Sequence, residues 1–513
     1  MTERSVYRGI GAPGYRKTGL RLLCFALLGI SLLSSPAVAQ TKTAASAAQS
    51  PSSSAPSASW KQIPVPPLHQ FHPQEPRRVE LPNGLVIFLQ EDHELPMING
   101  TIRIRGGRRD VPADKTGLEE VYAEVWRTGG TKEKTGDELD DFLETRAAGV
   151  EASPIGDSTS LSWSSLKEDF DPVLLVVLDL LQHPEFRQEK IDLAKQQIAS
   201  FISRRNDDIN QIAQRESTRL AYGRDNPYAR IAEYSTISAI SRDDLLNWHK
   251  RTVAPNNMIL GIAGDFDPTI MEGKLREAFG KLPKGEPFAK SEIPLQEPTP
   301  GIYLIEKDDV NQSTIEMVGL GIERRNPDYY AVEVVNDLFG GGFSSRLFVN
   351  IRTKLGLAYG VGGGIGAAYD HPGILRFSVG TKSGTTAAAL EALRKQMDEL
   401  VQKGVKDEEV RKAKDSILNS FIFSFDSKQK VLAERMAYEF YGYPTDTLER
   451  YRAGIEKVTV ADVDRVARKY IHPEKLAVLV VGNAKDFDKE LSTFGKVTPV
   501  DISIPQATPK GGN

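Results

Sequence analysis

TGLEEVYAEVWRTGGT, Thr116–Thr131, carries the strongest structural signal in this chain. Its apolar side chains recur three and four residues apart, the spacing of an amphipathic helix with one buried face. These side chains are Leu118, Val121, Tyr122 and Val125. The opposite face carries Glu120, Ala123 and Glu124. We therefore predict a helix that packs on one side and presents acidic residues on the other.

The acidic face has the frame of a zinc-peptidase helix without its ligands. In the inverted zinc motif H-x-x-E-H, histidine ligands flank a glutamate that acts as general base. Here Glu120 and Glu124 stand at the ligand positions and Ala123 at the base position. Such a zinc site needs neutral imidazoles, a carboxylate and an open position for water. We expect the helix to form without zinc chemistry.

The sequence gives little support for a different kind of metal site. Glu120 and Glu124 share a helix face, so a harder cation is an alternative there, but we favour a solvated acidic face because no further oxygen ligands are apparent nearby. For the histidines we expect surface or capping roles, since no two have helical ligand spacing. They are His69, His72, His93, His183, His249, His371 and His472.

Composition indicates a soluble protein that is exported. The 513 residues are 40% hydrophobic and 26% charged, as in a multi-domain globular chain. Arg16, Lys17 and Arg21 precede the apolar run 22–33, and Ala37-Val38-Ala39 follows it. This pattern predicts a signal peptide over residues 1–39 and a periplasmic location, because the apolar run is too short for a membrane span.

The net charge argues against nucleic acid and membrane surfaces as partners. Residues 1–39 hold five basic and one acidic side chains, which leaves 60 basic and 68 acidic ones and a net charge of −8. The single cysteine, Cys24, lies within the predicted signal peptide. We therefore expect no disulfide, no thiolate chemistry and no stable membrane insertion in the mature chain.

The sequence predicts two similar halves, each preceded by a linker. Residues 40–76 are rich in Ser, Ala and Pro and are predicted to be a flexible linker, and residues 285–300 are predicted to be a second one. Folded structure is expected over 77–284, beginning with a hairpin at Asn83-Gly84, and over 301–505.

An internal repeat supports duplication of one unit. Ser241–Gly264 aligns without a gap to Thr459–Gly482. Each segment has a Ser/Thr cap, an amphipathic helix, a proline (Pro255 or Pro473) and an apolar strand that ends in glycine. The sequence therefore predicts an α+β protein of two homologous halves.

Three motifs carry a resemblance to a known family: LPNGLVIFLQEDHELP, TGLEEVYAEVW and GGGFSSRLFVNIRTKLGLAYGV. Over residues 78–490 the chain resembles the pitrilysin/insulinase family of zinc peptidases, in its mitochondrial-processing-peptidase-like branch. The resemblance implies that each half is an antiparallel-rich sheet with helices packed on it. It also implies a homologous partner chain that carries the H-x-x-E-H motif and zinc, and a shared chamber for extended or unfolded peptides.

Residue by residue, the resemblance implies no metal in this chain. The first ligand, base and second ligand positions fall on Glu120, Ala123 and Glu124, and the third ligand position falls near Phe201. No cofactor is therefore expected here, and zinc is expected in the partner subunit. The family's Asn-Ala edge-strand signature is replaced by Glu151-Ala152, a departure from the substrate-gripping pattern.

The second half resembles the part of the family that contacts substrate. Arg352 and Tyr359 stand seven residues apart in NIRTKLGLAYGV. They correspond to a pair implied to bind the peptide near the scissile bond and to steady charge on its carbonyl oxygen. We therefore take Arg352 and Tyr359 as the candidate catalytic residues.

A glycine run precedes this pair in the sequence. It consists of Gly340, Gly341 and Gly342 and is followed by Phe343. The run lacks the G-K-[ST] of a phosphate loop, so we expect it to allow a tight turn or a close peptide approach. With Phe343, it is the candidate substrate-binding segment.

These expectations converge on the non-zinc subunit of an exported, two-chain metallopeptidase that degrades peptides. Arg352 and Tyr359 would act on a substrate held with the zinc-bearing partner. An inert scaffold or peptide-binding subunit of the same fold is the alternative. An independent peptidase that uses an unrecognised metal at Glu120 and Glu124 is the third and least favoured possibility.

Overall fold

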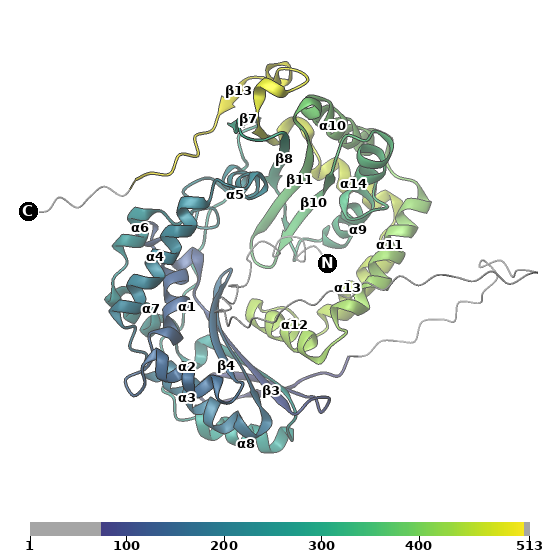
Figure 1. The fold of residues 1–513 in the computed structure, drawn as a ribbon. Helices are drawn as coiled ribbons and strands as arrows, with labels where there is room; N and C mark the ends of the chain where they lie inside the picture. The colour runs from purple at the N-terminus through teal and green to yellow at the C-terminus, as the bar shows by residue number, and fades with distance from the viewer. Residues whose placement is uncertain (1–72, 507–513) are drawn as a thin grey trace, which may run out of the picture. The chain divides into compact units, whose positions relative to one another are not determined.

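The computed structural model describes residues 73–506, which contain two β-sheets, each with its own set of helices (Figure 1). The predicted signal peptide and nearly all of the predicted linker 40–76 lie outside the described residues. The first sheet consists of β1 (Arg77–Glu80), β2 (Val86–Glu91), β3 (Met97–Arg105), β4 (Gly149–Ile155), β5 (Ser158–Leu166) and β6 (Met258–Gly264). The helices in the same half of the chain are α1 (Leu118–Thr128), α2 (Gly136–Glu144), α3 (Phe170–Gln182), α4 (Gln188–Arg204), α5 (Ile209–Tyr222), α6 (Tyr234–Ala239), α7 (Arg242–Thr252) and α8 (Pro268–Phe279).

The second sheet follows residues 280–300, which form no helix or strand. Its strands are β7 (Gly301–Glu306), β8 (Gln312–Leu320), β9 (Ile322–Glu323), β10 (Gly360–Ala368), β11 (Pro372–Lys382), β12 (Ala477–Gly482) and β13 (Val497–Pro499). Its helices are α9 (Tyr329–Gly340), a π-helix (Phe348–Lys354), α10 (Thr386–Lys403), α11 (Asp407–Phe421), α12 (Lys428–Tyr441), α13 (Thr447–Lys457) and α14 (Val460–Tyr470).

Five adjacent strands in each sheet share one topology. The strands of the first run in the order β1-β2-β6-β3-β5-β4, and those of the second in the order β13-β7-β12-β8-β11-β10-β9. In each, a parallel pair (β2 with β6, β7 with β12) is followed by three antiparallel pairings. The predicted α+β fold with two homologous, antiparallel-rich halves is confirmed.

The repeat seen in the sequence begins with the same cap in both halves. The Ser241 hydroxyl accepts from the Asp244 N–H at the start of α7, and the Thr459 hydroxyl accepts from the Asp462 N–H at the start of α14. Each aspartate accepts in return from the N–H of its cap residue, which completes a capping box. The strands that follow, β6 and β12, are buried along their whole lengths.

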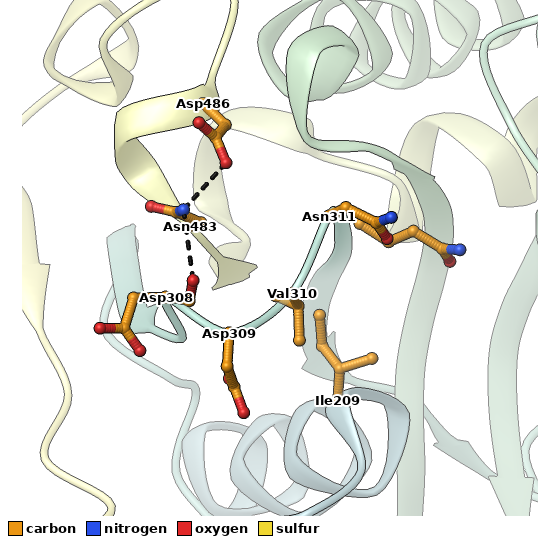
Figure 2. A pocket seen from close by; sticks show the side chains of 8 residues that line it. Ile209, Asp308, Asp309, Val310, Asn311, Asn483 and Asp486 are labelled. Atoms are coloured by element: carbon orange, nitrogen blue, oxygen red, sulfur yellow. Dashed lines mark hydrogen bonds between the residues drawn. The ribbon is translucent and has the colours of Figure 1, made fainter.

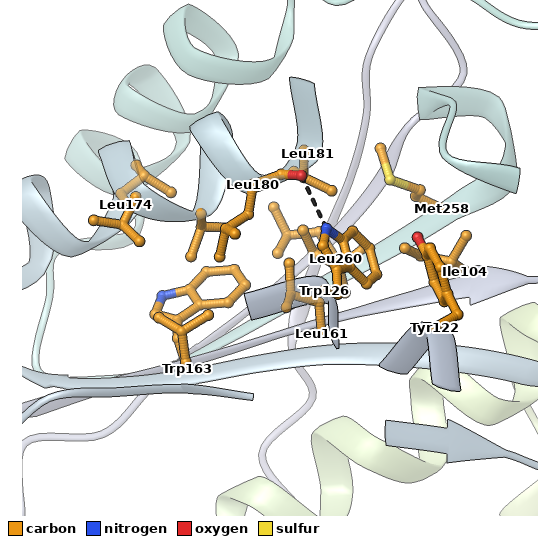
Figure 3. Close-up of a cluster of buried hydrophobic side chains, with 14 of the residues drawn as sticks. Ile104, Tyr122, Trp126, Leu161, Trp163, Leu174, Leu180, Leu181, Met258 and Leu260 are labelled. Atoms are coloured by element: carbon orange, nitrogen blue, oxygen red, sulfur yellow. Dashed lines mark hydrogen bonds between the residues drawn. The ribbon is translucent and has the colours of Figure 1, made fainter. Parts of the chain in front are cut away.

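The core of the first half is built around the tryptophan and tyrosine of α1 (Figure 3). Trp126 is fully buried, and its indole N–H donates to the carbonyl of Leu180 at 2.9 Å. The labelled side chains around it come from the first sheet and from α3. They are Ile104, Leu161, Trp163, Leu174, Leu181, Met258 and Leu260. This packing fixes the buried face of α1 and hence the direction of its other face.

His249 belongs to this core, so the expectation of a surface or capping role is wrong for it. Its side chain is buried, with Nε2 2.9 Å from the Leu181 carbonyl and Nδ1 2.8 Å from the Tyr122 hydroxyl. Because a carbonyl only accepts, Nε2 donates to Leu181 and Nδ1 accepts from Tyr122. Burial lowers the pKa of His249 to about 4, so the ring is neutral at pH 7.

Each sheet is covered on its second face by a helix from the other half. From α12, Leu432, Met436 and Phe440 pack on Val86, Phe88, Ile259 and Ala263 of the first sheet. From α5, Ile212 and Ala213 pack on Ile305, Leu479 and Val481 of the second sheet. A central strand with apolar groups on both faces needs cover on both sides, which explains why β6 and β12 are apolar throughout. Within the described residues, no helix is both long and apolar enough to cross a membrane.

Candidate functional site

The amphipathic helix predicted around the degenerate zinc motif is α1. Leu118, Val121, Tyr122 and Val125 are all buried, as their spacing predicts. The helix begins after Gly117, whose φ of 101° is a left-handed conformation that favours glycine. A side chain at 117 would collide with Ile237 of α6, so this glycine also permits close packing.

The other face of α1 is less solvated than the sequence suggests. Ala123 is buried, Glu120 is half-buried and only Glu124 is exposed, so a fully solvated acidic face is wrong. The neighbouring Glu119 is 3% exposed, and Glu119 and Glu120 each have one buried carboxylate oxygen without a hydrogen-bond partner. Burial, followed by the charge of Glu119, raises the pKa of Glu120 to about 7.

Phe201, near which the third ligand position is predicted, lies on α4, which runs antiparallel to α1. At one end, Arg187 donates to the Gly129 carbonyl at 2.6 Å. At the other end, Arg205 donates to Ala232, which also lies against Gly117. Phe201 is 75% exposed on α4.

The residues at the metal position do not fit zinc. They offer two carboxyl groups, a methyl group and a phenyl ring, with no imidazole. Burial raises the pKa of one of the carboxyls, Glu120, to about 7, which makes it a weaker anionic ligand at neutral pH. A zinc-activated water therefore has no support from this chain's own side chains.

A second set of metal-type ligands is already satisfied by internal cations. Ligand atoms of Asp157, Asp370 and His371 lie within 4.8 Å of one another. The Arg109 guanidinium lies 3.2 Å from Asp157 and 2.8 Å from Asp370, and Lys290 lies 2.8 Å from Asp370. This cluster is an ion-pair network between the β4–β5 and β10–β11 turns.

The glycine run at the end of α9 serves close packing and not a left-handed turn, since Gly340, Gly341 and Gly342 all lack a positive φ. A Cβ at Gly340 would lie 2.3 Å from the carbonyl oxygen of Gly363 on β10. One at Gly341, which caps α9, would lie 2.9 Å from the carbonyl oxygen of Asn336 in the last turn of the helix. One at Gly342 would meet nothing within 4 Å.

The three glycines of the run therefore differ in how tightly the backbone around them is packed. Gly340 and Gly341 are required by backbone packing within the chain, which the sequence expectation of a turn or a peptide contact did not include. Gly341 and Gly342 are also exposed, as is Phe343. Close approach of a peptide to these three residues stays a prediction.

Asn336 strengthens the contact between α9 and β10. Its side-chain amide donates to the carbonyl of Ile365 at 3.0 Å, and its Oδ1 accepts from the N–H of the same residue at 2.8 Å. This paired hydrogen bond holds the C-terminal end of α9 on the strand.

Arg352 lies on the π-helix that follows the glycine run. The wide turn is shown by the N–H of Leu355, which donates to the carbonyl of Asn350 five residues earlier. Arg352 is exposed, and its guanidinium lies over the ring of Phe348, 4.7 Å from the ring centre. Phe343, at the end of the glycine run and 80% exposed, meets the same ring edge-to-face at 4.9 Å.

Tyr359 lies at the other end of the same loop. Its N–H donates to Gly380 of β11 at 2.8 Å, which anchors the loop where β10 begins. The side chain is 53% exposed. The loop between the two residues turns back on itself, since the N–H groups of Gly356 and Leu357 donate to the carbonyls of Arg352 and Ile351. The structure thus brings Arg352, Phe343 and Phe348 together and holds Tyr359 on the same anchored loop.

Glu151 and Ala152 lie on β4, the edge strand of the first sheet. Pro154 pairs with Thr159 of β5 but has no N–H, so this pair is of the non-hydrogen-bonded type. The alternation then directs the N–H and C=O groups of Val150 and Ala152 toward the open edge. Glu151 itself forms an ion pair with Arg127 of α1 at 3.2 Å.

A separate cavity of about 590 Å³ lies where α5 begins, beside the loop between β7 and β8 (Figure 2). Its lining includes three acidic side chains, Asp308, Asp309 and Asp486, and none of the predicted site residues. Asn483 bridges two of its walls by donating to Asp486 at 2.8 Å and to the Asp308 carbonyl at 3.5 Å.

Sequence reasoning missed two features of this site. One is the burial of Glu119, which precedes the motif position Glu120 and is only 3% exposed. Phe348 lies four residues before Arg352, a spacing that places side chains next to each other on a helix and was an available signal.

The fold and the site define a duplicated, zinc-peptidase-like chain whose metal position lacks zinc ligands. Residues 239–417 match the family model described as the peptidase M16 inactive domain. This part of the chain is therefore similar to the inactive domain of M16 peptidases, and the resemblance of the chain to the pitrilysin/insulinase peptidases is confirmed.

Some of the similar proteins are named as zinc proteases, and others are named as non-peptidase or inactive homologues. The non-peptidase homolog YmxG of Helicobacter pylori is 23% identical over 408 residues, which cover 78% of this chain and 92% of that protein. An uncharacterized zinc protease of Rickettsia bellii is 24% identical over 409 residues, covering 78% and 90%. The crystal structure of a peptidase M16 inactive domain from Pseudomonas fluorescens has a TM-score of 0.72 at 24% identity, covering 80% and 98%.

Proposed function

We propose that this chain is the non-zinc subunit of an exported, two-chain zinc metallopeptidase that degrades peptides. A homologous partner with an H-x-x-E-H helix supplies the zinc, its water and the general base. This chain supplies Arg352 and Tyr359. The observation that carries the proposal is an exposed arginine–tyrosine pair on an anchored loop in a chain whose own metal position does not fit zinc.

The pair is suited to stabilise charge that develops on a peptide carbonyl. Guanidinium and phenol groups are hydrogen-bond donors, and donors held in place by the fold need no rearrangement when the charge forms. The salt bridges among residues 73–506 do not include Arg352, so its guanidinium remains available to a ligand.

The open edge of β4 supports binding of extended peptides. A peptide strand that pairs with the outward N–H and C=O groups of Val150 and Ala152 would extend the first sheet. Because these contacts involve main chain, they give affinity with little sequence preference. Pro154 ends the ladder, since it has no N–H to donate.

Co-purification with a tagged chain from the native source, followed by a peptidase assay, tests the proposal. We expect an H-x-x-E-H chain in the complex and chelator-sensitive cleavage that the isolated chain does not show. Arg352→Ala and Tyr359→Phe should each reduce kcat about 100-fold or more, the usual effect of removing a donor to developing charge.

Lys354→Ala is the matched control, because it removes an exposed cation from the same π-helix. It should leave kcat nearly unchanged. Normal turnover in both the Arg352 and Tyr359 variants would contradict the proposal.

The inert scaffold or peptide-binding subunit is the second candidate. It is favoured by the ion pair that ties Glu151 to Arg127, which engages the edge-strand signature within the chain. In that case the complex binds peptides, but its turnover does not depend on Arg352 or Tyr359.

A further inference from the structure

The π-helix has two faces with different roles. Leu347 and Ile351, four residues apart, are fully buried in the core of the second half. Phe348 and Arg352, also four residues apart, are shifted by one position and are more accessible. Asn350 donates to Gln396 of α10 at 2.6 Å, which fixes the backbone between them. The segment that carries Arg352 is therefore attached both to the core of the second half and to α10.

The guanidinium of Arg352 lies over an aromatic ring. Its carbon Cζ lies 4.7 Å from the centre of the Phe348 ring, within the range of a cation–π contact. Phe343 contacts the same ring with an interplanar angle of 87° and a centre-to-centre distance of 4.9 Å. An edge-to-face pair of this kind restrains both rings.

An aromatic support has a consequence that a carboxylate would not have. A salt bridge would occupy the N–H donors of Arg352 and compensate its charge. A cation–π contact uses none of the N–H groups as hydrogen-bond donors, so they stay free to bind a carbonyl oxygen. Contact with the ring can thus orient the Arg352 guanidinium and still leave its N–H donors free.

We propose that Phe348 is a positioning residue that holds the Arg352 guanidinium in the orientation needed to bind the substrate carbonyl, with Phe343 supporting the ring. This inference rests on the proposed function, because Arg352 must act on a substrate for its orientation to affect turnover. Phe348 itself need not touch the peptide.

A double-mutant cycle on the two-chain complex tests this role. Phe348→Leu removes the π face and keeps an apolar side chain, and it should reduce kcat about three- to tenfold, as expected for loss of a cation–π contact. Phe348→Tyr keeps the ring and should retain nearly full activity. In an Arg352→Ala background, Phe348→Leu should cause no further loss, because the side chain that it positions is absent.

A second readout requires neither partner nor substrate. In NMR spectra of the isolated chain, the ring current of Phe348 should shift the side-chain resonances of Arg352, which are assigned by their absence in Arg352→Lys. The shift should disappear in Phe348→Leu and persist in Phe348→Tyr. Unchanged thermal melting would show that both variants are folded.

The outcomes separate the two proposals. An effect of Phe348→Leu that persists in the Arg352→Ala background, or an unaltered Arg352 resonance in Phe348→Leu, would overturn the positioning role. If Arg352→Ala leaves turnover intact while the resonance still depends on the Phe348 ring, the proposed function fails and the orienting contact stands.

Discussion

At the level of single residues, burial favours the protonated form of the carboxyl groups at and beside the predicted metal position. Glu119 and Glu120 follow each other at the start of α1, where burial disfavours the charged form of both. Arg108 offsets this only weakly, since its Nε lies 3.7 Å from Glu119 and the side chain is half exposed. Burial therefore leaves an adjacent pair of carboxyl groups whose pKa values are both raised.

Glu120 should make stability depend on pH. Its pKa is about 7 in the folded chain and 4.5 when exposed, so the folded state retains a proton that the unfolded state releases. Stability should then fall as pH rises from about 4.5 to about 7 and level off above that. Glu120→Gln should remove this loss, a gain at pH 8 relative to pH 5 on the order of 2 kcal/mol in urea melts.

Glu124→Gln is the matched control, because Glu124 is exposed on the same helix. Its effect should stay within about 0.5 kcal/mol at both pH values, as for most surface substitutions. A Glu120→Gln variant whose stability tracks that of the natural chain at both pH values would show that Glu120 is not the titrating group.

At the level of secondary-structure elements, glycines decide how closely α9 approaches β10. Gly340 ends α9 against the carbonyl of Gly363, and Gly364 lies under the Asn336 side chain. The loop that carries the candidate residues is connected to both elements, since the glycine run follows α9 and Tyr359 precedes β10. Close packing of the two elements therefore sets the distance between the ends of this loop.

Gly340→Ala should destabilise the protein, because its Cβ would meet backbone atoms that cannot move aside. A cost of about 1–3 kcal/mol is expected, as for other overpacking substitutions. Gly342→Ala should be within about 0.5 kcal/mol of neutral, since its Cβ has open space around it. Urea denaturation of both variants measures the difference, and equal costs would refute the packing role of Gly340.

Across the whole described chain, the exchanged helices α5 and α12 couple the two halves. Removing either half would expose the face of a central strand in the other, because α12 covers β2 and β6 and α5 covers β7 and β12. The Arg109 network adds a polar connection between the halves. Residues 73–506 should therefore unfold as a single cooperative unit.

Tryptophan fluorescence can test this coupling, because all tryptophans of the described chain, Trp126, Trp163 and Trp248, lie in the first half. Leu393→Ala creates a cavity in the core of the second half and should cost about 2–5 kcal/mol. If the halves are coupled, this variant lowers the fluorescence midpoint together with that of far-ultraviolet circular dichroism. An unchanged fluorescence midpoint would mean that the halves unfold independently.

Local patterns were sufficient where neighbours in sequence are neighbours in space. The periodicity around Val121 predicted α1, the cap residues Ser241 and Thr459 predicted the repeated helices, and Asn83-Gly84 predicted the hairpin between β1 and β2. These signals depend on contacts within about four residues, which the sequence displays directly.

The order of residues alone established the two homologous halves, the amphipathic α1 and the absence of histidine from the predicted metal position. The burial of Glu120 and His249, the cover that α5 and α12 give to the opposite half's sheet, and the place of Phe348 under Arg352 arise only when the chain is folded. Burial of a side chain and the partner that it meets depend on residues far along the chain, and no local period encodes them.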